Sequence, residues 1–302
     1  MSDVSTLFGF RRILVALDAS RESQAALAAA AGLARQLDAE LMGLFIEDID
    51  LLNLAALPFS REIPVLSLSG RDLDLATTER ELRSKAAAAR RDLAAMADRF
   101  HLPWSFRVSR GHVDTELLTA AQGADLIAVG KGARPISART RLGSTGRAIV
   151  TRTARSVLFA ARVDSPADAP VAVLYEEGGS SAAIVLAARL AERDRRRLVI
   201  FVLGDSESAL AQQEISVNRQ LRVLGASAAF LPVRPSEPTS LWQALQANSP
   251  NLLILDALPK LLPEVTLDLL VEKSNCSLLL LRNWELAPTA DTPRDGRQAD
   301  KP

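Results

Sequence analysis

A repeated alternation of short apolar runs with longer amphipathic segments constrains this chain most strongly. The first run spans 13–18, and a matching run at 171–176 begins the pattern again at an offset of 158 residues. Short continuous apolar runs are typical of strands buried on both faces of a parallel sheet. Because helical patterns lie between the runs, we expect α/β domains.

The expected elements follow the same order in both halves. Strands are expected at 13–18, 41–46, 104–108, 124–129 and 156–160, and again at 171–176, 198–203, 226–233, 251–255 and 277–281. This order predicts two tandem doubly wound, Rossmann-like domains with five-stranded parallel sheets, related by internal duplication. We place the domains at 1–163 and 164–286 and a disordered tail at 287–302. We expect 49–73 to be an irregular connection.

Composition excludes several classes of function. The 302 residues carry no net charge, and the isoelectric point is about 6.8, so nothing favours nucleic acid or an anionic membrane as a partner. No apolar run reaches the roughly 18 residues that span a bilayer, and the N-terminus does not resemble a signal peptide, so we expect a cytoplasmic protein. Two histidines and the single Cys276 cannot build a typical zinc site.

The segment 129–145 has the parts of a phosphate site. It follows the apolar run at 124–129 and precedes a helical pattern that begins near 146. It contains glycines, cations and hydroxyl groups. Glycines let backbone N–H groups approach an anion, and a helix N-terminus presents unpaired donors. Ligands bind open α/β sheets at the carboxyl ends of the strands, where the strand order reverses. We expect Asp18 and Gly130 to flank that point.

Each half resembles a universal stress protein domain, over 10–162 clearly and over 170–282 weakly. The resemblance rests on the run 13–20, on Gly111-His112-Val113, on 124–130 and on Leu142-Gly143-Ser144. ATP-binding members carry Gly-x2-Gly-x9-Gly-(Ser/Thr). Gly130 and Gly143-Ser144 fit this spacing, whereas Ala133 stands at the middle position. Gly132 would replace it only if the loop shifted by one residue.

The resemblance implies a nucleotide site in the first half. Asp18 would lie beside the nucleotide, and Phe45 would be the counterpart of an apolar residue that contacts adenine. The residues expected around the phosphates are Gly130, Ala133, Gly143, Ser144 and Thr145. Local positive charge comes from Lys131, Arg134, Arg139 and Arg141, which could neutralise phosphates. The implied ligand is ATP, with or without Mg²⁺.

The second half replaces the glycines with acids. Gly130 aligns with Asp256, and Gly143 aligns approximately with Glu264; carboxylates there would repel a triphosphate. We therefore expect no nucleotide in the second half, and we interpret Gly130 and Gly143 as positions that accommodate ligand. In the family this chain resembles, the fifth strand is an edge used for pairing, so the resemblance implies that the second half pairs with the first about a pseudo-twofold axis, through the edges at 156–160 and 277–281, which also need cover.

The favoured function is that of a stress-response regulator that binds ATP with little or no hydrolysis. No catalytic residues are identified, because Ser144 has no evident His/Asp partners and the loop lacks the Gly-Lys-(Ser/Thr) ending of a P-loop. The main alternative is a nucleotide-free interaction module with a vestigial pocket, in which Asp18 only helps to cap a helix. A small enzyme is a third hypothesis. A homo-oligomer or a regulatory protein partner is compatible with each.

Overall fold

The computed structural model describes the strands of both halves and most of the helices. The described residues are 10–57, 61–62, 71–72, 74–131, 149, 152–161, 166, 168–179, 181–256, 269–271 and 274–282. Most of the segment 129–145 lies outside these ranges, as does the tail at 287–302. Of the expected nucleotide-site residues, those outside the described part are Gly132, Ala133, Arg141, Gly143, Ser144 and Thr145.

The first half alternates strands and helices as the sequence predicts. Its main strands are β1 (Arg12–Leu17), β2 (Glu40–Asp48), β5 (Trp104–Gly111), β6 (Leu126–Gly130) and β7 (Ser156–Ala160). Its helices are α2 (Arg21–Leu37), α3 (Ile49–Ala56), α4 (Leu75–Phe100) and α5 (Val113–Ala121).

The second half repeats this alternation. Its strands are β8 (Val171–Tyr175), β9 (Leu198–Leu203), β10 (Ala229–Val233), β11 (Leu252–Asp256) and β12 (Ser277–Leu281). Its helices are α7 (Ser181–Arg193), α8 (Glu207–Leu224) and α9 (Pro238–Asn248).

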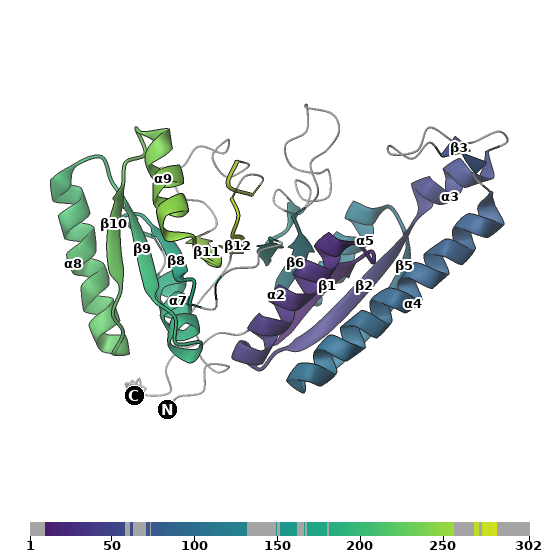
Figure 1. The fold of residues 1–302 in the computed structure, drawn as a ribbon, viewed down its shortest axis with the longest axis horizontal. Helices are drawn as coiled ribbons and strands as arrows, with labels where there is room; N and C mark the ends of the chain where they lie inside the picture. Colours follow the sequence, from purple (N-terminus) through teal and green to yellow (C-terminus); the bar gives the residue numbers. More distant parts are fainter. Residues whose placement is uncertain are drawn as a thin grey trace, which may run out of the picture.

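All ten main strands form one sheet, in the order β10-β9-β8-β11-β12-β7-β6-β1-β2-β5 (Figure 1). The order β5-β2-β1-β6-β7 of the first half is the order β10-β9-β8-β11-β12 of the second, and pairing within each half is parallel. The α/β doubly wound fold is therefore confirmed. A common origin of the halves stays an interpretation of this repeat.

The two halves meet where β7 and β12 pair in antiparallel fashion, with Leu158 opposite Leu279. Equivalent strands that pair antiparallel are related by a local twofold rotation, so the expected pseudo-twofold contact through these two edges is present. β5 and β10 are left as the outer strands of the sheet. The strand expected at 104–108 is therefore an edge strand of the sheet.

Apolar side chains cover both faces of the sheet, as the continuous apolar runs predict. Ile13, Val15 and Leu17 belong to a core that includes residues of α2 and α4. Leu14, between them in sequence, belongs to a second core with Leu117 of α5. This alternation within one strand is what a sheet buried on both sides requires. Within the described residues, no helix is both long enough and apolar enough to span a membrane.

The expectation of an irregular connection at 49–73 is wrong for its described parts. Asp48 caps α3 by accepting a hydrogen bond from the Asp50 amide at 3.0 Å, and Leu52 and Ala55 bury one side of the helix. β3 (Arg61–Glu62) and β4 (Arg71–Asp72) then form a two-stranded antiparallel pair. The apolar spacing over a single short helix was too brief to distinguish from a loop.

Candidate functional site at the carboxyl edge of the sheet

The order of strands reverses between β1 and β6, which are hydrogen-bonded neighbours. β1 continues to β2 on one side, whereas β6 lies on its other side and continues to β7. Asp18 follows the last residue of β1, and Gly130 is the last residue of β6. The predicted placement of these two residues at the switch point is confirmed, and this is where open α/β sheets bind ligands.

Asp18 organises the turn from β1 into α2. Its Oδ1 accepts a hydrogen bond from the Ser20 amide at 2.9 Å, and Ser20 Oγ accepts one from the Ser23 amide at 3.1 Å, which caps α2. Partial desolvation by the surrounding turn raises the pKa of the Asp18 carboxyl, but hydrogen bonds from Ser20 and Ser23 outweigh this effect and hold the pKa below its ordinary value. The capping role is confirmed. Asp18 is also exposed, so its carboxylate is accessible to a ligand.

Gly130 is explained by packing against α2. A Cβ at this position would lie 2.5 Å from the carbonyl carbon of Glu22 and 2.8 Å from its Cβ. Glu22 is in the first turn of α2, so glycine lets the helix N-terminus approach the end of β6. Packing against α2 therefore requires glycine here whether or not a ligand is bound, so accommodation of a ligand is not needed to explain Gly130. The close approach also brings the positive end of α2 toward the candidate site.

The structure corrects the role expected for Lys131. Its Nζ donates to the carbonyl of Ser274 at 3.2 Å, to Ser274 Oγ at 2.7 Å and to the carbonyl of Cys276 at 2.7 Å. An ammonium group has three N–H donors, so these acceptors of the second half use its full capacity. Burial lowers the pKa of Lys131 to about 8. In this arrangement Lys131 offers no donor to a phosphate.

Phe45 lies in the core, with 2% of its surface exposed. It is opposite Leu17 in the β1–β2 register and shares the core that includes residues of α2 and α4. The next position along β2 is Ile46, which is half-buried, packs on the opposite core and follows in register beside Asp18. Ile46 is thus the better placed apolar neighbour of the site. Strand alternation from Asp18 could have identified it.

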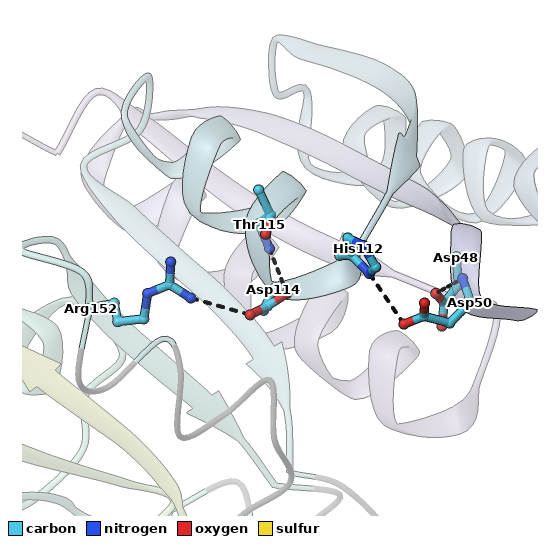
Figure 2. A network of polar contacts seen from close by, with 6 residues as sticks. All are labelled: Asp48, Asp50, His112, Asp114, Thr115 and Arg152. Carbon is cyan, nitrogen blue, oxygen red and sulfur yellow. Dashed lines mark hydrogen bonds and ion pairs between the residues drawn. The ribbon is translucent and has the colours of Figure 1, made fainter.

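A polar network lies along the same edge of the first half, and the sequence reasoning missed it (Figure 2). His112, the N-cap residue of α5, places Nδ1 3.2 Å from a carboxylate oxygen of Asp50. Asp114 accepts a hydrogen bond from Arg152 at 3.2 Å and one from the Thr115 amide at 2.9 Å. The available signal was an acid two residues after β2 and another three residues after β5, since the ends of parallel strands lie at one edge of the sheet.

The second half ends its equivalent strands differently. β11 ends at Asp256 where β6 ends at Gly130, and β8 is followed by Glu176, which is 8% exposed. Three residues connect β1 to α2, at 18–20, whereas at least four, at 176–179, separate β8 from α7. Among the described residues of the whole chain, no group of three or more His, Cys, Asp or Glu side chains could hold a metal ion.

Comparison with solved structures supports the fold over nearly the whole chain. A universal stress protein from Archaeoglobus fulgidus DSM 4304 matches with a TM-score of 0.67 and 13% identity, covering 93% of this chain and 99% of that one. A functionally unknown protein from Pseudomonas aeruginosa PAO1 matches with a TM-score of 0.57 and 15% identity, covering 93% and 94%.

A universal stress protein solved in complex with cAMP also matches, with a TM-score of 0.36 and 22% identity, covering 50% of this chain and 96% of that one. No curated protein matches the chain. The model of the universal stress protein family matches residues 9–161, which is just over half of the 302 residues. The chain therefore belongs to the universal stress protein family.

Proposed function

We propose that this chain is a nucleotide-binding regulator of the universal stress type, which binds ATP in its first half and none in its second. One observation carries the proposal. At the switch point, the exposed carboxylate of Asp18 follows β1, and the neighbouring strand β6 ends in Gly130. The equivalent strand of the second half, β11, ends in Asp256.

The chemistry of the described edge suits a nucleoside phosphate. The Asp18 carboxylate can accept hydrogen bonds from an amine or a hydroxyl group, and Ile46 offers a half-buried apolar surface next to it in register. The N-terminus of α2 approaches Gly130, where its dipole favours a phosphate group. In this proposal the remaining phosphate contacts come from Gly143, Ser144, Thr145 and Arg141.

The proposal includes little or no hydrolysis. His112 is paired with Asp50 in the exposed network, and we assign no residue the role of general base. A specific observation favours the alternative of a nucleotide-free interaction module. Because packing against Glu22 already explains Gly130, that glycine by itself does not require a ligand.

Calorimetric titration of the full chain with ATP and Mg²⁺ tests the proposal. Gly143→Glu copies the acid of the second half, and we expect it to weaken ATP binding by about tenfold or more through charge repulsion. Glu264→Gly is the matched control in the second half, and we expect it to leave the affinity unchanged. Cyclic AMP, the ligand of one relative, serves as a second probe. A folded wild-type protein that gives no heat with either nucleotide would overturn the proposal.

A further inference from the structure

The seam between the two halves carries reciprocal hydrogen bonds on either side of the β7–β12 pair. Ser277 Oγ accepts from the Ala161 amide at 3.2 Å, and Ser156 Oγ accepts from the Arg282 amide at 3.1 Å. Ser156 and Ser277 are the first residues of β7 and β12. These two contacts are equivalent under the pseudo-twofold, so they join the halves without distinguishing one from the other.

Two cationic side chains also form hydrogen bonds across the seam. Their acceptors are equivalent under the pseudo-twofold, but the two donors come from non-equivalent strands. Thr153 and Ser274 each stand three residues before the equivalent strands, and each carbonyl accepts from a cation of the opposite half. Arg282, just after β12, donates to Thr153 at 2.5 Å. Lys131, just after β6, donates to Ser274 at 3.2 Å. Lys131 therefore reaches the seam from the strand that ends at the candidate site.

Lys131 forms hydrogen bonds both through its backbone amide and through its side-chain ammonium group. Its amide donates to the carbonyl of Ala160 at 2.9 Å, and its ammonium contacts Ser274 and Cys276. Ser274 is 9% exposed, and its Oγ also donates to the carbonyl of Leu270 at 2.5 Å. The chain of contacts runs from Gly130, through Lys131, into the segment that enters β12. Ser274 and Cys276 both belong to the second half, just before β12.

We propose that Lys131 is a positioning residue through which the second half holds the end of β6 and so sets the nucleotide affinity of the first half. The inference rests on the proposed function, because it concerns the same site. In this inference the second half supports the site of the first half. It is not proposed to bind nucleotide itself, because its equivalent strand ends in Asp256 in place of a glycine. The competing role, direct contact of Lys131 with phosphate, makes different predictions for Ser274.

A double-mutant cycle measured by calorimetry with ATP and Mg²⁺ tests the inference. Lys131→Met keeps an unbranched side chain one atom shorter but removes its donors, and Ser274→Ala removes an acceptor in the other half. We expect Ser274→Ala to weaken ATP binding by about fivefold, the equivalent of one net hydrogen bond, and Lys131→Met, which loses three hydrogen bonds, to weaken it at least as much. We expect the double variant to be no weaker than Lys131→Met, because both changes break one connection.

Ser156→Ala is the matched control, since it removes a seam hydrogen bond that does not involve Lys131. We expect it to leave the ATP affinity within about twofold, and urea unfolding checks that every variant is folded. Amide exchange of residues 126–131 is expected to rise in Lys131→Met and in Ser274→Ala, but not in Ser156→Ala.

The outcomes separate this inference from the proposed function. ATP binding that Ser274→Ala leaves unchanged, or effects of Lys131→Met and Ser274→Ala that simply add, would overturn the inference alone. Equal weakening by Ser156→Ala would also overturn it, because the seam as a whole would then set the affinity. Failure of the folded wild type to bind ATP would overturn the proposed function and this inference with it.

Discussion

The ends of β6 and β11 occupy equivalent places in the two halves, yet one is Gly130 and the other Asp256. The strand order around them is the same, so the sheet does not account for the difference. The connection that precedes the neighbouring helix does differ: three residues lead into α2, and at least four lead into α7. The shorter connection accompanies the close approach of Glu22 to Gly130.

A repeated strand pattern therefore does not imply the same packing at the strand ends. The second half indicates that a side chain is allowed at this position of the fold. It does not indicate that one is allowed at Gly130, because the backbone of α2 occupies the space where a Cβ would stand. The difference between Gly130 and Asp256, which the sequence attributes to a ligand, thus also has a cause in the packing of α2 against β6.

The strongest way to test the comparison is Gly130→Ala. The added Cβ would meet the backbone of Glu22, which cannot move as a flexible side chain could, so we expect a loss of about 3 kcal/mol in the free energy of unfolding. Gly32→Ala, inside α2, is the control. A Cβ there meets nothing within 4 Å, so we expect a gain of up to about 1 kcal/mol. Urea unfolding measures both, and a loss below about 0.5 kcal/mol for Gly130→Ala would refute the packing account.

The pH dependence of stability tests the asymmetric contact of Lys131. Burial lowers its pKa from 10.5 to about 8 in the folded chain. Between these values the unfolded chain binds more protons, so stability rises with pH, by at most about 1.4 kcal/mol per pH unit. We expect urea unfolding from pH 8 to pH 10 to show this rise relative to Lys131→Met. The exposed Lys85→Met should keep the wild-type slope. Parallel curves for wild type and Lys131→Met would contradict the prediction.

A smaller effect is expected at Asp18, whose place after β1 corresponds to Glu176 after β8. Asp18→Ala removes the acceptor of the Ser20 amide and should cost about 1 kcal/mol, whereas Asp18→Asn keeps an acceptor and should cost less than half of that. Because the folded pKa of Asp18 lies below its ordinary value of 3.8, its charge-dependent stabilisation is present above that pH and is lost on further acidification. Equal losses for the two variants in urea unfolding at pH 7 would contradict the hydrogen-bond account.

The smallest effect is expected in the polar network that distinguishes the edge of the first half. The first turn of α5 contains Asp114, whereas the first turn of α9 contains no acid. Asp114→Asn weakens the exposed pair with Arg152 and should cost about 0.5 kcal/mol or less, and the difference should vanish in high salt. Thermal unfolding at low and high salt measures it. A cost that persists in high salt would show that the pair is not the cause.

The sequence predicted the fold well because its signals are local and repeated. Continuous apolar runs such as 13–18 identified strands buried on both faces, and the helical patterns between them identified the helices that cover the sheet. The pairing of β7 with β12 was expected from the resemblance, in which the fifth strand is a pairing edge, and from the apolar character of both edges. Switch-point geometry placed Asp18 and Gly130 correctly, since strand order decides which ends become neighbours.

The details of the site depended on contacts between residues far apart in sequence. The partners of Lys131 stand 143 and 145 positions away, and no local pattern marks them. The Glu22 contact that explains Gly130 depends on how closely α2 approaches β6. Phe45 was assigned to the site from the resemblance, but the pleat of β2 turns it into the core and brings Ile46 beside Asp18 in its place.

The stoichiometry of ATP binding tests the difference between the halves most directly. Calorimetric titration of the full chain with ATP and Mg²⁺ yields the number of sites per chain. The account predicts one site, in the first half, where β6 ends at Gly130. Two equivalent sites would contradict the claim that Asp256 and its surroundings exclude nucleotide from the second half, and zero sites in a folded chain would contradict nucleotide binding altogether.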